Sequence, residues 1–317
     1  MMNIGFYGKG GSGKTTLSAL FSLYLDKQNK KIGLLDVDVN SHTSDVLGIA
    51  ADETKVLSRS ENELSIWKYL SGVNTRVQPS EFLNTTPPGR GSGMWTMDSD
   101  NFLTKSFGQS FGKQAKLFTV GTYEPESVGI SCHHTTQSVA ENMVSHFNGK
   151  KDDVLVIDSV AGNDAFGTTL FLNDLLVFVV KPEREGVSVM KRFLDLAEAA
   201  GISDHVVIVG NQVGSKIQED FLRGEIPADK LMGTLKTDHG VIDMRLQDKP
   251  LDEGCITSEA EEIFNKIYKV AEAKHDKARK YAKLINLHTK VAAEDWVAGS
   301  YRTGLVDQID PECAHSA

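Results

Sequence analysis

A glycine-rich segment near the start of the chain restricts the fold more than any other feature. The sequence GKGGSGKTT, residues 8–16, follows an apolar segment and precedes a helical pattern, which is the context of a P-loop. Glycines let successive backbone N–H groups point inward as a nest for phosphate oxygens, and the helix dipole strengthens the site. We therefore expect the phosphates of a nucleotide to be bound by Gly10, Gly11, Ser12, Gly13, Lys14, Thr15 and Thr16.

The loop carries two lysines in different positions. Lys14 is placed to reach the β- and γ-phosphates, and the hydroxyl of Thr15 is placed to coordinate Mg²⁺. Lys9 directly follows Gly8 at the mouth of the loop, where a second lysine is redundant for one chain that holds one nucleotide. It becomes useful when it reaches a nucleotide in a facing subunit and meets the charge that develops on the transferring phosphoryl group. Both lysines are candidate catalytic residues, and Lys9 predicts a homodimer around ATP.

Short apolar segments recur along the chain and end in polar residues or glycine. Their nearly continuous Val, Ile and Leu content is typical of strands buried on both faces of a parallel sheet. Helical patterns separate several of them, which implies strand–helix–strand units with right-handed crossovers. The sequence thus predicts an α/β fold, a P-loop NTPase with a mostly parallel twisted β-sheet flanked by helices on both faces. The expected strands are residues 3–8, 31–38, 153–160, 175–180, 205–211 and 230–235.

The chain is expected to form a single P-loop ATPase domain over residues 1–290, with a helical and loop insertion at about 51–120. Two interpretations of the insertion stay open: a lid or partner surface, or an elaborated surface excursion. From Ser258 to about Lys290 the spacing predicts one long helix whose second half is basic. Residues 291–317 show no strong pattern and are expected to form a partly disordered tail.

Polar residues end several expected strands, at the edge where open α/β sheets bind ligands. Asp36 and Asp38, in DVDVN, face the same side of an extended strand, and Asp158 ends the apolar run DVLVID. Carboxylates in such places hold Mg²⁺ directly or through water. Asn211 ends VVIVGN, and its amide can both donate to and accept from the edge of adenine. No carboxylate follows it within a few residues to accept from guanine, so ATP is favoured over GTP.

The segment GKGGSGKTT, with a lysine directly after its first glycine, resembles the deviant Walker A motif of the MinD/ParA-type ATPases. That class includes the arsenite-pump ATPase, the nitrogenase iron protein and the CooC-type nickel-insertion ATPases. DVD, VLVID and VVIVGN follow in the order of the family, so the resemblance covers most of residues 1–260. It implies hydrolysis of ATP to ADP and phosphate, with Mg²⁺ as cofactor, in a dimer that closes on ATP.

The resemblance also implies roles for single residues. It makes Asp38 the switch I aspartate that orients the attacking water, with Asp36 nearer the metal. SVAGNDAFG (159–167) resembles a switch II, whose glycine can move when the γ-phosphate leaves. Asp238, in LKTD, is a further candidate for the base pocket beside Asn211. The implied Mg²⁺ ligands are Thr15, Asp36, Asp38 and Asp158.

A second candidate site lies in GISCHHTT, residues 129–136. Cys132 and the two histidines after it are ligands for a soft or borderline metal, and two copies across a dimer axis would supply a Cys₂His₂ set. The CooC-type proteins carry Cys-x-Cys near this location, but Ile130 occupies the place of the first cysteine here. No cysteine follows Asp158 closely enough to complete an iron–sulfur cluster, which excludes that cofactor. Two interpretations stay open: Cys132 as a soft-metal ligand, or a polar interface loop with an ordinary thiol.

The motifs support two functions of different kinds. The first is an ATP-hydrolysing dimerisation switch that acts on a client protein, similar to the CooC-type accessory ATPases of metallocentre maturation. The alternative is ParA/MinD-like DNA partition or cargo positioning, in which the basic residues between Lys274 and Lys290 bind DNA non-specifically. A non-catalytic nucleotide sensor is disfavoured because the chain retains Lys9, Lys14, Asp38 and Asp158.

Composition limits the compartment and the partners. With a net charge of -9, the chain as a whole is not suited to coat nucleic acid or an anionic membrane. No apolar run approaches the roughly 20 residues that span a bilayer, and no signal-peptide pattern is seen. The acidic C-terminal tail also lacks a basic amphipathic helix. The three cysteines are widely separated, which suits a reducing compartment. We expect a cytoplasmic protein that does not bind membranes.

Overall fold

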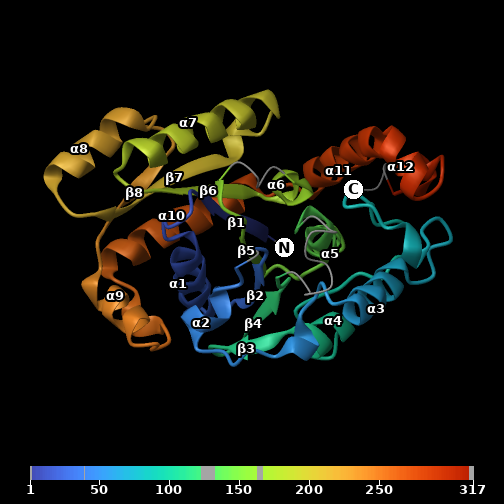
Figure 1. Cartoon of the computed structure of the whole chain (residues 1–317), viewed down its shortest axis with the longest axis horizontal. Helices are drawn as coiled ribbons and strands as arrows, with labels where there is room; N and C mark the ends of the chain where they lie inside the picture. Colours follow the sequence, from blue (N-terminus) through green and yellow to red (C-terminus); the bar gives the residue numbers. More distant parts are fainter. Residues whose placement is uncertain (1, 39, 123–132, 163–166, 314–317) are drawn as a thin grey trace.

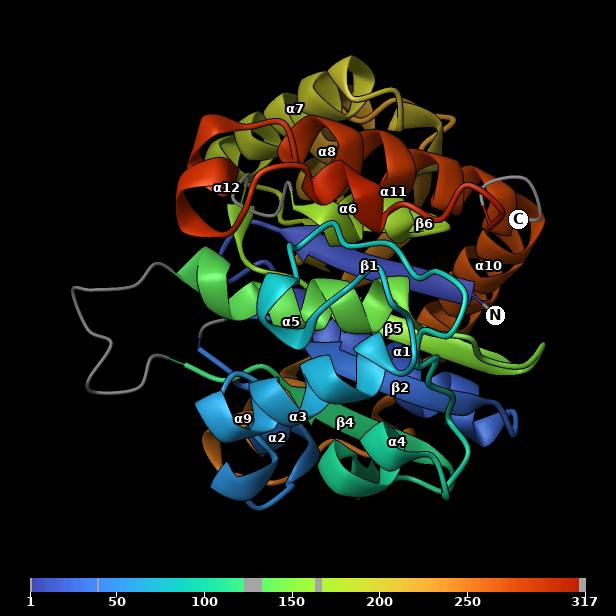
Figure 2. The same cartoon turned by 90° about the vertical axis from the view of Figure 1, so that its right-hand side faces the viewer.

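A computed structural model describes residues 2–38, 40–122, 133–162 and 167–313, with the backbone alone for residues 133–136. Within these ranges the chain builds an eight-stranded sheet with helices packed against both faces (Figure 1, Figure 2). The strand order is β3-β4-β2-β5-β1-β6-β7-β8, and neighbouring strands are parallel except β3 and β4. The expected α/β fold with a mostly parallel sheet is therefore confirmed.

The strands are rich in buried apolar residues on both faces of the sheet. Successive residues of a strand point to opposite sides: Val154 and Val156 lie in the core on one side, and Leu155 and Ile157 in the core on the other. This two-sided burial is the reason that the central strands are continuous apolar runs in the sequence. The strands are β1 (Met2–Gly8), β2 (Lys31–Asp36), β3 (Gln109–Phe111), β4 (Ala115–Thr119), β5 (Asp153–Asp158), β6 (Leu175–Val180), β7 (Val206–Val213) and β8 (Leu231–Lys236).

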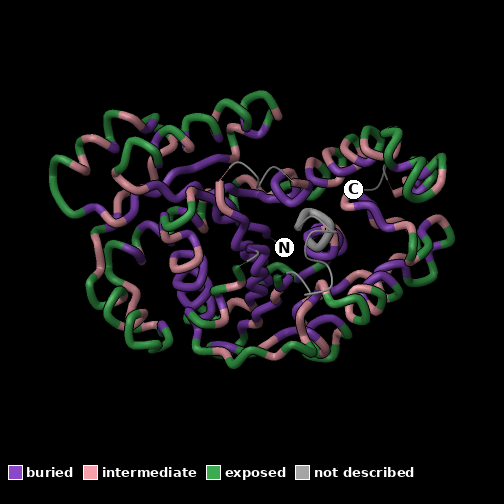
Figure 3. The backbone as a smooth tube through the Cα atoms, viewed as in Figure 1, coloured by how far each residue is buried: buried purple, intermediate pink, exposed green. Residues whose placement is uncertain are grey.

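Helices form a layer on each face, and the buried residues concentrate between the layers (Figure 3). Within the described ranges, no helix is both long enough and apolar enough to cross a bilayer. One face carries α1 (Lys14–Lys27), α2 (Thr43–Leu47), α9 (His239–Leu246) and α10 (Ser258–Lys274). The other carries α5 (His133–Ser145), α6 (Thr168–Leu172), α7 (Arg184–Ala199), α8 (Lys216–Glu225) and α11 (Lys277–Val291).

The region expected to be a helical and loop insertion, about 51–120, returns to the sheet before it ends. It contains α3 (Ser60–Ser71) and α4 (Phe102–Phe107), but β3 and β4 follow, and β4 pairs in parallel with β2. The helical and loop part is therefore shorter than expected. The strand β4 was missed because it lies near the edge of the sheet, where polar residues such as Lys116 and Thr119 interrupt the apolar run.

The single helix expected from Ser258 to about Lys290 is two helices, α10 and α11, separated by His275 and Asp276. The side chain of Asp276 accepts the N–H of Arg279 at 3.0 Å and so caps the start of α11. The break lets the chain change sides, because α10 packs in the core on one face and Leu284 of α11 packs in the core on the other.

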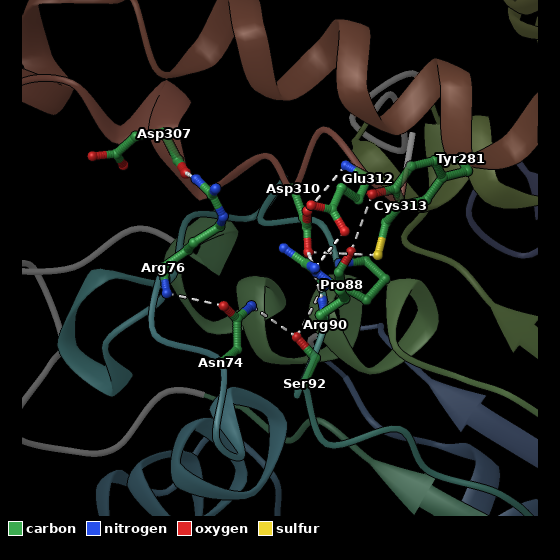
Figure 4. Close-up of polar contacts among 11 residues, drawn as sticks. Asn74, Arg76, Pro88, Arg90, Ser92, Tyr281, Asp307, Asp310, Glu312 and Cys313 are labelled. Atoms are coloured by element: carbon green, nitrogen blue, oxygen red, sulfur yellow. Dashed lines mark hydrogen bonds and ion pairs between the residues drawn. The ribbon is translucent and has the colours of Figure 1, made fainter. Parts of the chain in front are cut away.

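The C-terminal tail packs against the insertion. In place of the partial disorder expected for the tail, its described part forms α12 (Asp295–Ser300) and a 3₁₀ turn, Leu305–Gln308. Asp310 accepts hydrogen bonds from the backbone and the side chain of Arg90, each at 3.0 Å (Figure 4). Arg76 donates to the backbone oxygen of Asp307. Hydrogen bonds from the insertion thus order the tail. The sequence of the tail alone gives no sign of these contacts.

Part of the basic run in α11 lies inside the fold. Lys280 is buried, and its Nζ lies 2.8 Å from Oδ2 of Asp174, which precedes β6. The same carboxylate accepts the backbone N–H of Asn3 at 2.8 Å, and its other oxygen lies 3.1 Å from Nδ1 of His275. These residues join the starts of β1 and β6 to the junction between α10 and α11.

Replacing Lys280 by alanine should destabilise the folded chain by roughly 3–5 kcal/mol, because the buried carboxylate of Asp174 loses its paired charge. Urea unfolding followed by circular dichroism measures the change. The control is Lys277→Ala, an exposed lysine at the start of the same helix, for which we expect a change below about 0.5 kcal/mol. Equal stability of the two variants would contradict the structural role of Lys280.

Candidate nucleotide-binding site

The glycine-rich loop connects β1 to α1 and ends at Gly13, which precedes α1 in a left-handed conformation (φ 92°). A Cβ atom at this position would lie 2.3 Å from Nδ2 of Asn211, so both the backbone and the available space exclude a side chain. Asn211, in β7, donates from Nδ2 to the backbone oxygen of Ser12 at 2.8 Å. The residue expected to read the base therefore also supports the phosphate loop.

Lys14 lies among carboxylates from the ends of β2 and β5. Its Nζ is 2.5 Å from Oδ2 of Asp38 and 3.8 Å from Oδ1 of Asp158. The parallel register places Asp36 beside Asp158, so the structure brings the expected carboxylates together around one ammonium group. Burial alone would lower the pKa of Lys14. The charges of Asp158, Asp38 and Asp36 outweigh this effect and hold the pKa above its ordinary value.

The carboxylates of this cluster differ in their ionisation. Asp36 is fully buried, and its oxygens accept the backbone N–H groups of Asp38 and Thr43, each at 3.2 Å. Burial, and after it the charge of Asp158, raises the pKa of Asp36 to about 7. Burial also raises the pKa of Asp158. The partial burial of Asp38 acts in the same direction, but Lys14 outweighs it and holds the pKa of Asp38 below its ordinary value. Asp38 is thus the carboxylate that ionises most readily.

The cluster fits a magnesium ion that is bound together with phosphates. Oδ1 of Asp158 is buried and has no hydrogen-bond partner among the described residues, and Thr15 hydrogen-bonds to the same carboxylate. Mg²⁺ typically uses one or two carboxylates, with substrate phosphates and water as its other ligands. In the described ranges, no three His, Cys, Asp or Glu side chains are arranged to hold a metal ion by themselves. Thr15 and Asp158 could therefore hold Mg²⁺ beside a phosphate, with Asp36 and Asp38 close by.

A pocket of about 560 Å³ opens beside the loop, between α1, the end of β7 and α9. Gly13, Thr16, Asn211 and Asp238 all line it, so both expected base-pocket residues lie next to the phosphate loop. Asp238 also caps α9, because its Oδ1 accepts the N–H of Val241 at 3.1 Å. Apolar walls with a few polar groups are typical of a pocket for a small molecule or cofactor.

Lys9 lies partly exposed at the mouth of the loop, in a small recess that Val180 and Lys181 also line. Its backbone oxygen accepts the N–H of Ser12 at 3.0 Å, which closes a turn of the loop. Its side chain forms no hydrogen bond or ion pair with another residue that the structure describes. The two lysines of the loop therefore differ: Lys14 is enclosed by carboxylates, and Lys9 is partly exposed at the mouth of the loop.

Cys132, the candidate soft-metal ligand, lies outside the described residues. Of His133 and His134 only the backbone is described, at the start of α5. The soft-metal interpretation therefore stays a prediction. Cys255 and Cys313 are free thiols.

Thr43, the first residue of α2, is a part of the cluster that the sequence did not reveal. Its N–H donates to Asp36, and its hydroxyl donates to Oδ2 of Asp158 at 3.3 Å. It thereby connects the ends of β2 and β5. The only signal in the sequence is the Ser/Thr-rich segment NSHTSD after Asp38, and such segments are common in loops.

The fold and this arrangement of loop, carboxylates and pocket define a nucleotide-binding protein of the P-loop class. Residues 6–251 match the CobQ/CobB/MinD/ParA nucleotide-binding domain (CbiA), and the chain belongs to this family. The resemblance to the MinD/ParA-type ATPases is therefore confirmed.

Three relatives share low sequence identity with this chain. It is 26% identical over 276 residues to an uncharacterised ATP-binding protein of Methanocaldococcus jannaschii, covering 85% of this chain and 98% of that protein. It is 21% identical over 243 residues to the carbon monoxide dehydrogenase accessory protein CooC of Rhodospirillum rubrum, covering 76% and 85%. It is 24% identical over 204 residues to the septum site-determining protein MinD of Thermotoga maritima, covering 64% and 60%.

Solved structures agree on the fold. A ParA family ATPase from Chlorobium tepidum superposes with a TM-score of 0.57 at 16% identity, covering 84% of this chain and 97% of that one. The septum site-determining protein MinD from Pyrococcus horikoshii, complexed with Mg-ADP, superposes with a TM-score of 0.54 at 17% identity, covering 87% and 99%.

The raised pKa of Asp36 should make the stability of the nucleotide-free chain depend on pH. The folded chain keeps this proton up to about pH 7, whereas an unfolded aspartate loses it near pH 4. The folded state thus binds more protons in this window, and its free energy of unfolding should fall as the pH rises from about 4 to 7. Asp36→Asn should flatten this slope, as measured by urea unfolding at several pH values.

Glu141, whose pKa burial raises to about 7, contributes a slope of the same sign to both proteins. The difference between the two slopes therefore belongs to Asp36 and the groups coupled to it. Identical slopes would show that the carboxylate of Asp36 is ionised at ordinary pH in the folded chain.

Proposed function

We propose that this chain is an ATP-hydrolysing switch that forms a homodimer when it binds ATP. The observation that carries the proposal is the contrast between the two loop lysines. Lys14 is enclosed by Asp38 and Asp158, while the side chain of Lys9 has no hydrogen-bond or ion-pair partner among the described residues and lies at the open side of the loop. A second chain that faces the loop would bring its own Lys9 toward the phosphates, where a positive charge stabilises phosphoryl transfer.

The phosphates of a bound nucleotide would compete with Asp38 for the ammonium group of Lys14. In the structure Lys14 donates to Asp38 at 2.5 Å. When phosphates occupy the loop, Lys14 would turn to their oxygens, since an anion inside the nest attracts the ammonium group. Asp38 would then be free to accept a proton from, or to orient, an attacking water. The exchange of one ion pair thus connects the occupancy of the loop with the readiness of the hydrolytic carboxylate.

Other residues of the site would hold the nucleotide in place. Thr15 and Asp158 would hold Mg²⁺, which neutralises phosphate charge when bound. Asn211 and Asp238 would contact the adenine in the pocket beside Gly13. The closeness of these residues around the loop supports each of these roles.

For the client, we favour a metalloenzyme or a metal carrier. The similarity to the accessory protein CooC extends over 85% of that protein, which supports a role in metallocentre maturation. DNA partition or cargo positioning, suggested by the MinD and ParA relatives, is the alternative. The basic run of α11 supports it less than the sequence suggested, because Lys280 pairs with Asp174 and Arg279 donates to the backbone oxygen of Asn173.

Replacing Lys9 by alanine should leave ATP binding intact, because Lys14 and the loop amides remain. It should abolish ATP-dependent dimerisation and lower kcat by roughly a thousandfold, the scale of a positive charge supplied by a partner subunit. Analytical ultracentrifugation with ATP and a phosphate-release assay measure the two effects. Lys181→Ala is the control, because Lys181 lines the same recess but pairs with Glu183 at 3.0 Å. A fully active Lys9→Ala would overturn the proposal.

Replacing Asp38 by alanine should trap an ATP-bound dimer, because Lys14 stays available to phosphate while the hydrolytic carboxylate is lost. We expect kcat to fall by roughly 10²–10⁴-fold. Gel filtration after incubation with Mg-ATP measures the lifetime of the dimer, and mass spectrometry identifies proteins that co-purify with it. Rapid hydrolysis by this variant would contradict the role of Asp38.

A further inference from the structure

A buried carboxylate outside the nucleotide site anchors the helix that follows the switch-like segment 159–167. Oε1 of Glu141, in α5, accepts the backbone N–H of Thr168 at 2.6 Å, at the start of α6. The N–H of Thr169, the hydroxyl of Thr168 and the side chain of Asn84 also hydrogen-bond to this carboxylate. Glu141 thus joins α5, α6 and the insertion at one buried point.

Glu141 does for α6 what a capping side chain normally does. The first N–H groups of a helix have no partner inside the helix, and the residue before α6, Gly167, supplies no side-chain cap. A Cβ atom at Gly167 would lie 2.5 Å from Oε1 of Glu141. Glycine at this position therefore leaves room for an acceptor from another helix.

The contact between Glu141 and α6 lies close in sequence to the nucleotide site, because α6 is the next α-helix that the structure describes after β5. The strand β5 ends at Asp158 in the nucleotide site, and the N–H of Ser159 donates to the backbone oxygen of Phe6 in β1 at 3.2 Å. The next helical residue that the structure describes is Thr168, held by Glu141. Among the described residues, Ser159 is thus held by β1 and Thr168, directly after the switch-like segment, by α5.

We infer that Glu141 is a positioning residue of the ATP site: it fixes the far end of the switch-like segment and couples that segment to α5 and the insertion. The inference rests on the proposed ATPase function. Besides the contact with Asn84, the next residue of α5, Asn142, donates to the backbone oxygen of Leu83 at 2.8 Å. A displacement of Thr168 is therefore passed to α5, and from α5 to residues 83–84 of the insertion.

Glutamine is the natural conservative replacement for this residue. Because burial raises the pKa of Glu141 to about 7, the neutral form is close in free energy to the ionised one. An amide oxygen of the same reach can still accept the N–H of Thr168. Alanine removes the acceptor and leaves the first N–H groups of α6 without a partner.

The first experiment compares steady-state ATP hydrolysis by the full chain and its variants. Glu141→Ala should lower kcat by roughly tenfold and leave KM for ATP nearly unchanged, as expected for a residue that acts through coupling. Glu141→Gln should restore kcat. Asn142→Ala is the matched control, because it loses the contact with Leu83 and keeps the contact with Thr168, so kcat should stay near that of the natural chain.

The second experiment follows amide hydrogen exchange with and without Mg-ATP. In the natural chain, ATP should increase protection in α5 and in residues 82–90. Glu141→Ala should lose both effects, and Asn142→Ala should weaken only the second, because the contact between Asn84 and Glu141 remains. If Glu141→Ala does not fold, Gly167→Ala replaces it, because its Cβ displaces the carboxylate while Glu141 remains.

Two results would overturn the inference: a folded Glu141→Ala with natural kcat and natural ATP-dependent protection, or a Glu141→Gln as defective as Glu141→Ala. If the natural chain binds ATP but does not hydrolyse it, the proposed function fails. The exchange experiment still decides the inference in that case, because it depends on nucleotide binding alone.

Discussion

The ammonium group of Lys14 stabilises the carboxylates that gather at the C-terminal ends of β2 and β5. Adjacent parallel strands bring Asp36 and Asp158 side by side in a buried place, where burial and the charge of Asp158 raise the pKa of Asp36 and the charge of Lys14 acts against them. The position of Lys14 depends on the loop before it, which needs a glycine at residue 13 because Asn211 packs there. The phosphate loop, the strand ends and the candidate base pocket are thus one connected unit. A change in the charge near Lys14 alters the electrostatic environment of each part.

Among the described residues, two contacts join elements around this unit to one another. Thr43 ties the start of α2 to both Asp36 and Asp158, so the segment after β2 responds to the state of the carboxylates. Glu141 ties the start of α6 to α5, beyond the segment that follows Asp158. Contacts of this kind can pass a change in the ion pairs of the site to the neighbouring helices.

The sequence predicts the features that depend on local pattern. Central strands are continuous apolar runs, and parallel strands end at one edge, so the pattern alone places Asp38, Asp158 and Asn211 near the loop. The prediction fails where tertiary context decides: β4 is interrupted by polar residues, and Lys280 looks like a surface lysine until Asp174 is found beside it. The contacts of Thr43 and Glu141 have no periodic signal. The cap at Asp276, in contrast, has a local signal, an aspartate before a new helical run.

The cluster around Asp174 also has a consequence for the order of events during synthesis. Asp174 pairs with the backbone of Asn3 at the beginning of the chain, but its counter-charge Lys280 comes 106 positions later. At the usual pace of translation this interval lasts roughly 5–20 s, during which the carboxylate lacks that counter-charge. Enclosing an unpaired carboxylate is costly, so the core at the starts of β1 and β6 reaches its full stability only with α11. The helix that looks like an appendage of the nucleotide-binding domain thus contributes to the stability of its first strand.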